Sequence, residues 1–240
     1  MIIRDHPKRI AIPQAAHAEL TAELARHLDY ERAGLTDPPE TWFQAAARHD
    51  DGWLYWDRQP EVNPKTGTWF DFMNMPAATH LSIWKRSVEL SQGLHPAVAW
   101  WVSRHVVGLF DMHDWSKEGW YVQRQGREFR KRQLLLQDQF EPAVQNFKGY
   151  EQLGDLLSQC DWLSLVLCMG HSEADILPMF SRGDQTPKVV AEGSKVRIQN
   201  GWFRPERIEC EVQAFEVPDE PVSYLYECTP VTLSWKIEMV

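Results

Sequence analysis

The chain has 240 residues, of which 43% are hydrophobic and 25% are charged, and its formal net charge is −9. These proportions are those of a globular protein, and the length suits one helical core with a modest appendage. The acidic balance argues against a sequence-independent nucleic-acid binder, which needs a basic surface, but a metal ion would still admit a small anionic substrate. No apolar run reaches the length of a membrane span, so the expected partner is a small-molecule substrate, with no nucleic acid and no membrane.

The cysteines are spaced too irregularly for a disulfide framework. Cys160, Cys168, Cys210 and Cys228 form no CxxC pair. Reduced thiols in a cytoplasmic protein are the simplest interpretation, because stable disulfides belong to oxidising compartments. The opening residues also lack the apolar core of a signal peptide. We therefore expect a cytoplasmic protein.

Helical patterns fill the first three quarters of the chain. Apolar residues recur every fourth position after Pro13, which predicts a first helix that ends by Gly34. A second helix is predicted to begin after Asp37 and to end at Gly52, because an acid followed by prolines is a typical helix start. Further helices are predicted over residues 77–91, 96–110, 116–148 and 150–169, with an irregular loop over residues 57–76.

The composition changes after Pro178, where Val, Ile, Tyr, Phe and Thr become frequent. Strands are predicted over residues 188–199, 207–217 and 222–239. The fold expected is mainly α: a helical bundle domain over residues 1–178, followed by a small antiparallel β appendage over residues 179–240. The edge of that sheet is a candidate dimer edge, so a homo-oligomer is a further expectation.

The most distinctive local feature is the segment Arg-His-Asp-Asp-Gly-Trp at residues 48–53. Adjacent residues on a helix project about 100° apart, so His49 and Asp50 can both reach a metal ion lodged against that helix. Imidazole together with carboxylate suits Fe, Mn, Zn or a related divalent ion. The pair therefore indicates a metal site.

Three other polar residues are predicted to face the core. His17 shares a helix face with apolar neighbours three and seven positions later, and His105 lies among apolar residues at helical spacing. Asp161 lies on the most apolar predicted helix of the chain. An uncompensated buried carboxylate is costly, and a role as a metal ligand removes that cost.

These residues follow a known order. A His on one helix, a His-Asp pair on the next and an Asp on a late helix give His17, His49-Asp50 and Asp161. In this order the chain resembles the HD-domain superfamily of metal-dependent phosphohydrolases. The segment at 49–53 is similar to the family's His-Asp-x-Gly-Lys version, and that at 160–163 is similar to its closing Ala-Asp-x-Leu segment.

A closer resemblance, covering roughly residues 13–170, is to an uncharacterised bacterial family within this superfamily. It depends on the His-Asp-Asp-Gly-Trp segment, on the Trp56-Asp57 loop and on the Asp-Trp-Leu-Ser-Leu sequence at 161–165. This resemblance implies a helical fold and a site but no established reaction.

Two-metal members of the superfamily add two histidines between these landmarks, where this chain has His80 and His105. The resemblance then implies one or two divalent ions. The first ion would be held by His17, His49, Asp50 and Asp161, with Asp50 as a bridge, and the second site would be completed by the two added histidines. The residues expected to act in catalysis are Asp50, His80 and His105.

The leading hypothesis is therefore a metal-dependent hydrolase of a small phosphorylated compound or nucleotide, in which the metal activates water. A mixed-valent di-iron oxygenase with the same six ligands and a non-catalytic binding or scaffold protein are the alternatives. Trp53 departs from the family pattern, because many relatives have a lysine there that contacts substrate anions. The candidate cations to replace it are Arg48, Lys85, Arg86 and Arg104.

Overall fold

The computed structural model describes residues 1–5, 8–175, 188–199, 203–204, 207–218 and 222–239. The helices are α1 (Gln14–Arg26), α2 (Glu40–Arg48), α3 (Leu54–Arg58), α4 (Ala77–Gln92), α5 (Pro96–Met112), α6 (Trp120–Phe140) and α7 (Tyr150–Met169). The strands are β1 (Ile2–Arg4), β2 (Ile10–Ile12), β3 (Glu173–Asp175), β4 (Lys188–Glu192), β5 (Lys195–Gln199), β6 (Ile208–Glu216) and β7 (Thr229–Met239).

The described strands form one seven-stranded sheet in the order β1-β2-β6-β7-β5-β4-β3. The prediction of a predominantly helical chain is confirmed, but an all-helical classification is wrong because this sheet is substantial. The sheet is also not confined to the C-terminal part, since β1 and β2 join it through β6. Nor is it wholly antiparallel, since β5 runs parallel to β7. The expected domain boundary at residues 178–179 lies outside the described residues.

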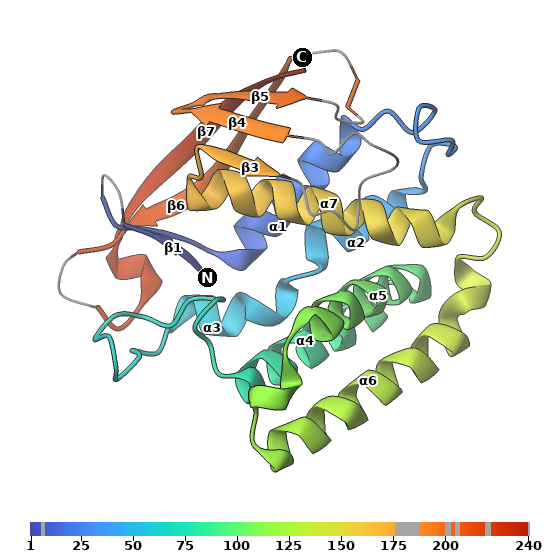
Figure 1. Ribbon diagram of the computed structural model, residues 1–240, viewed down its shortest axis with the longest axis horizontal. Helices are drawn as coiled ribbons and strands as arrows, with labels where there is room; N and C mark the ends of the chain where they lie inside the picture. The colour runs from blue at the N-terminus through green and yellow to red at the C-terminus, as the bar shows by residue number, and fades with distance from the viewer. Residues whose placement is uncertain (6–7, 176–187, 200–202, 205–206, 219–221, 240) are drawn as a thin grey trace.

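The helices form two groups around the sheet (Figure 1). Helix α1 packs against β6 and α7 packs against β1, so these two helices connect the sheet to the helical part. Helices α4, α5 and α6 lie on the far side, and α2 bridges α1 and α5. The two groups therefore meet along α1, α2, α5 and α7.

Residue patterns explain the elements that surround this meeting point. Alternate residues of β6 are buried, beginning with Ile208 and Cys210, as expected of a strand with one face on the core. Helix α5 is apolar on most sides and begins at Pro96, after His95 accepts a hydrogen bond from the backbone of Ala97. Helix α7 ends at Gly170, which has a positive φ of 73°.

The expectations about membrane spans and about the cysteines can be compared with the structure. Within the described residues, no helix combines the length and the hydrophobicity that a membrane crossing needs. The four cysteines are free and buried, in agreement with the prediction of unpaired thiols.

Candidate metal centre

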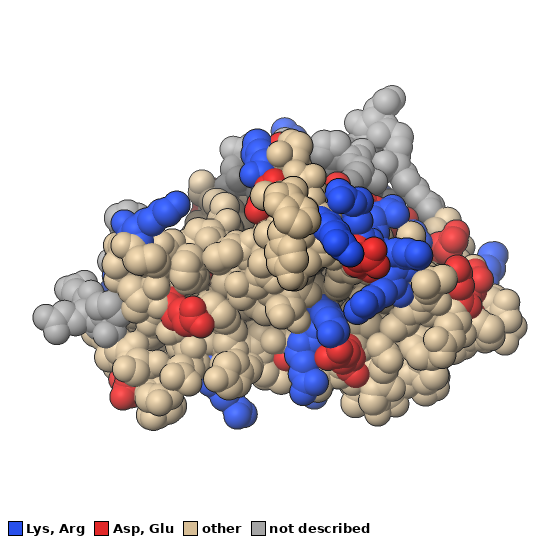
Figure 2. Space-filling view, turned by 90° about the horizontal axis from the view of Figure 1, so that it is seen from below, with Lys and Arg blue, Asp and Glu red and all other residues tan. Residues whose placement is uncertain are grey.

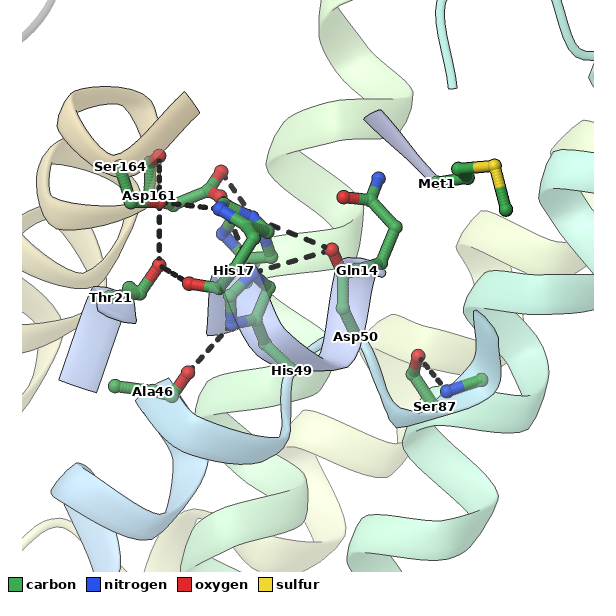
Figure 3. A network of polar contacts seen from close by, with 12 residues as sticks. Met1, Gln14, His17, Thr21, Ala46, His49, Asp50, Ser87, Asp161 and Ser164 are labelled. Atoms are coloured by element: carbon green, nitrogen blue, oxygen red, sulfur yellow. Dashed lines mark hydrogen bonds and ion pairs between the residues drawn. The ribbon is translucent and has the colours of Figure 1, made fainter. Parts of the chain in front are cut away.

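Five of the six predicted residues meet where the two helix groups join, and Figure 3 labels four of them, all but the one from α5. They are His17 from α1, His49 and Asp50 from the segment after α2, His105 from α5 and Asp161 from α7. All five are buried, with exposed fractions between 1% and 6%. The sequence order of the candidates therefore becomes a single interior cluster.

Asp161 is the centre of this cluster. Its Oδ1 atom lies 2.8 Å from Nε2 of His17 and 3.3 Å from Nε2 of His49. Its Oδ2 atom lies 3.6 Å from Nε2 of His105. The carboxylate of Asp161 thus faces three imidazoles, and each imidazole presents its Nε2 atom to it.

Asp50 approaches the same nitrogens from another side. Its Oδ2 atom lies 3.7 Å from Nε2 of His17 and 3.6 Å from Nε2 of His49. Helix α2 ends at Arg48, so the expectation that both members of the His-Asp pair lie inside a helix is wrong. Asp50 has left the helical conformation, with φ −108° and ψ 15°, and this bend turns its carboxylate toward the cluster.

The outer nitrogen of each imidazole is anchored. Nδ1 of His17 contacts the hydroxyl of Ser164, Nδ1 of His49 lies 2.7 Å from the carbonyl of Ala46, and Nδ1 of His105 lies 3.1 Å from the hydroxyl of Ser158. A carbonyl oxygen only accepts, so Nδ1 of His49 carries the proton and donates. In the neutral ring Nε2 then presents a lone pair, which is the arrangement that metal-ligating histidines adopt.

Two of these Nε2 atoms indicate that the cluster suits a cation. Nε2 of His49 and Nε2 of His105 are buried and make no hydrogen bond in the described structure. A buried polar atom without a partner is costly, and a metal ion together with a water molecule bound to it would satisfy both. The donor atoms of His17, His49 and Asp161 all lie within 4.8 Å of one another, so this group can hold a metal ion.

The protonation of the cluster follows from its charges. Burial favours the neutral form of His49, but the negative charges of Asp50 and Asp161 outweigh it and raise the pKa to about 9. Burial opposes ionisation of Asp161, yet the imidazoles of His17 and His49 hold its pKa well below its usual range. Burial raises the pKa of Asp50 and lowers that of His105 to about 3.

His80 makes different contacts from the other candidates. Its ring stacks on Trp84 at a centroid distance of 5.2 Å and meets the edge of Trp53 at 5.5 Å. The group of mutually close metal-binding atoms found among the described residues consists of His17, His49 and Asp161, so it leaves out His80 and also Asp50 and His105, although these last two lie within 4 Å of group members. Burial lowers the pKa of His80 to about 4, which suits a neutral ring among aromatic neighbours. The structure thus offers no support for His80 as the sixth ligand.

Trp53 belongs to a small buried cluster together with Met75 and Ile83. The residue that departs from the His-Asp-x-Gly-Lys pattern therefore packs into the protein. Gly52, just before it, donates a backbone hydrogen bond of 2.9 Å to Ser87 on α4. A Cβ atom at Gly52 would overlap the carbonyl oxygen of Ile83, so only glycine allows this close approach.

Sequence reasoning missed the residues that support His17. Ser164 also donates to the carbonyl of Asp161 at 2.8 Å and lies 2.9 Å from the hydroxyl of Thr21. Both hydroxyl residues are fully buried. Ser164 follows Asp161 by three positions, so it lies on the same face of α7. That spacing was the available signal, although serine is too common in helices for it to be decisive.

Comparison with known proteins gives a family without an assigned activity. A family model described as "Protein of unknown function (DUF3891)" matches residues 1–226. Searches of curated proteins and of solved structures found no significant match. The match spans all five clustered residues, so the site lies within the region that the family model describes.

Proposed function

This chain belongs to the DUF3891 family of proteins of unknown function, and we propose that it is a metal-dependent hydrolase of a small phosphorylated compound or nucleotide. The observation that carries the proposal is the convergence of three imidazole Nε2 atoms on two carboxylates in the protein interior. The order of these residues along the chain is that of the HD-domain phosphohydrolases, which supports the same activity.

His17, His49 and Asp161 would hold a divalent ion, and Asp50 would be a further ligand on the open side of the two imidazoles. Iron, manganese and zinc all suit a donor set of imidazole and carboxylate. When bound, such an ion lowers the pKa of a coordinated water and stabilises negative charge on a substrate oxygen.

The residues of the chain position the reactants. Ser164 and Ala46 fix the rings of His17 and His49. His105 is kept neutral by burial and is bound through Nδ1 to Ser158, so its Nε2 is available to accept a hydrogen bond from the attacking water. The surrounding apolar core excludes other water, which strengthens each electrostatic interaction at the site.

The contacts of His80 favour hydrolysis over the oxygenase alternative. A di-iron oxygenase of the expected type needs six ligands, and His80 packs against Trp84 and Trp53. Four ligands, with His105 beside them, suit a single ion with open positions for water and substrate.

Phosphate release is the direct test. Protein loaded separately with Mn²⁺, Fe²⁺ and Zn²⁺ is incubated with a panel of sugar phosphates, nucleoside monophosphates and cyclic nucleotides. We expect release from at least one class with wild type and with Asp155→Asn, which changes an exposed acid on α7, and none with Asp161→Asn. Oxygen consumption without phosphate release by the iron-loaded protein would identify the oxygenase instead. Failure of the purified protein to take up any metal would favour a scaffold role.

A further inference from the structure

Gln14 is the first residue of α1 and lies at the edge of the metal centre. It precedes His17 by three positions and Thr21 by seven, so all three side chains project from one face of the helix. Figure 3 shows the Gln14 amide beside the cluster, on the side where the carboxylate of Asp50 lies. The position is fixed, because the backbone N–H of Gln14 donates a 2.7 Å hydrogen bond to Asp57.

The side chain of Gln14 is buried, and its carbonyl oxygen has no hydrogen-bond partner among the described residues. The residue is 3% exposed, and its Oε1 atom is among the buried polar atoms that have no partner in the described structure. A buried amide usually has its hydrogen bonds satisfied, since leaving one unmade costs about 1–3 kcal/mol. By contrast, the buried Gln133 receives a hydrogen bond from Ser103. Gln14 therefore has the features of a residue that binds a ligand.

The charges around the centre indicate which ligand needs an amide. Asp50 and Asp161 make the cluster acidic, and the candidate cations lie elsewhere. Arg48 lies 3.8 Å from Asp51 and is 48% exposed at its side chain, whereas Arg104 lies 3.2 Å from Asp155.

Lys85 and Arg86 both lie within 4 Å of Glu89, with side chains 57% and 60% exposed. Figure 2 shows groups of basic side chains on the outer surface of the helical part, interspersed with acidic ones. These four cations are therefore paired with other acids, and a neutral donor beside the centre is a further means of binding an anionic substrate.

We propose that the carboxamide of Gln14 binds the phosphoryl group of the substrate at the metal centre, with its unpartnered Oε1 accepting from a protonated phosphate oxygen and its N–H groups donating to an ionised one. This inference rests on the proposed phosphohydrolase function and adds a substrate-binding residue to it. A carboxamide offers two N–H donors without a charge, so it can bind an oxyanion beside two carboxylates. Its oxygen can accept from a hydroxyl or a protonated phosphate oxygen in the same ligand.

Inorganic phosphate is the probe that tests this role. Its binding to Mn²⁺-loaded protein is measured by titration calorimetry, and the Mn²⁺ affinity of each metal-free variant is measured in parallel. The test variant is Gln14→Met, which keeps the size of the side chain and removes its polar atoms. The matched control is Gln133→Met, at a buried glutamine on α6. Gln14→Glu provides a second test variant that keeps the side chain polar.

We expect Gln14→Met to bind Mn²⁺ like wild type and to bind phosphate about tenfold more weakly, as the loss of one or two hydrogen bonds implies. Gln14→Glu is expected to lose phosphate binding through repulsion while it retains Mn²⁺, and Gln133→Met is expected to bind both like wild type. Equal phosphate affinity in Gln14→Met and wild type would overturn the inference and leave the proposed function intact. Loss of Mn²⁺ from Gln14→Met would also overturn it, by making Gln14 part of the metal site. Wild type that binds Mn²⁺ but no phosphate would reject the proposed substrate class itself.

Discussion

Nε2 of His17 and Oδ1 of Asp161 lie 2.8 Å apart, although one residue is near the start of the helical region and the other is near its end. The same helix that supplies Asp161 also supplies Ser164, which contacts the opposite nitrogen of the His17 ring. Helix α7 therefore determines both the position and the orientation of the imidazole on α1. Such anchoring of the outer nitrogen is the arrangement that fixes the ring orientation of metal-ligating histidines.

His49 and His80 are expected to respond differently to substitution. His49→Asn removes a ligand and should weaken Mn²⁺ binding by more than the ~100-fold that loss of a supporting residue costs. His80→Asn should leave Mn²⁺ affinity unchanged, because His80 contacts Trp84 and Trp53. Calorimetric titration of both metal-free variants checks this. An equal loss of affinity in the two would restore His80 as a ligand.

Loss of the hydroxyl that holds His17 should weaken metal binding without abolishing it. Ser164→Ala removes the contact to Nδ1 of His17, so we expect about 10–100-fold weaker Mn²⁺ binding. Ser82→Ala changes an exposed serine on α4 and serves as the control. Wild-type affinity in Ser164→Ala would show that the packing of α1 alone orients the ring.

Metal uptake should release protons in a pH-dependent way. His49 has a raised pKa of about 9 in the metal-free protein, so near pH 7 it is protonated and must lose its proton to bind a metal. Titrations in two buffers of different ionisation enthalpy should show release of about one proton from His49 near pH 7 and almost none near pH 10. His49→Asn should lack this proton. Uptake without proton release near pH 7 would mean that His49 is already neutral.

The stability of the metal-free protein should fall as the pH rises through the same range. A pKa raised on folding stabilises the folded state fully below the unfolded value, which is about 6.5, and the contribution is lost as pH rises through about 9. Asp161, with its lowered pKa, contributes in the opposite sense and loses its contribution on acidification. Thermal unfolding of metal-free wild type and His49→Asn across this range measures the difference. If the unfolding temperatures of the two proteins changed with pH in the same way, the raised pKa of His49 would be contradicted.

Two glycine-to-alanine substitutions should change the free energy of unfolding in opposite directions. In Gly52→Ala the new Cβ would overlap the carbonyl oxygen of Ile83 and lie 2.7 Å from the backbone nitrogen of Ser87, neither of which can move freely. We expect destabilisation of about 3 kcal/mol or more, together with loss of metal binding. Gly108→Ala on α5 meets no atom within 4 Å and should stabilise the helix by about 0.5–1 kcal/mol. Chemical denaturation of both variants provides the comparison.

The helical part of the site was predictable because its signals are local. Apolar residues at helical spacing located α4, α5 and α7 nearly to their observed bounds. A histidine or aspartate on the apolar face of such a helix must point inward, so His17, His105 and Asp161 could be assigned before their partners were known. The group of His17, His49 and Asp161, which could hold a metal ion, then needed only the chain order of these residues.

Other features depend on contacts between distant segments. His80 lies at a suitable sequence position for a ligand, but its side chain stacks on Trp84, and spacing does not distinguish these outcomes. The Oε1 atom of Gln14 has no partner in the described structure, and only the burial of this side chain beside the cluster makes it noticeable. Strands β1 and β2 have three residues each, too few for a periodic pattern, and β2 pairs with β6 from the other end of the chain.

The central position of β7 has a consequence for how the protein is made. It is the last described strand in the chain, yet it lies fourth among seven, between β6 and β5. While the polypeptide emerges from the ribosome, the strand that lies between β6 and β5 is therefore still missing. Helix α1 then packs on β6 while one edge of that strand is unpaired. Nascent chains must pass through a stage with unpaired edges, and interruption of translation just before Thr229 would leave fragments prone to aggregate.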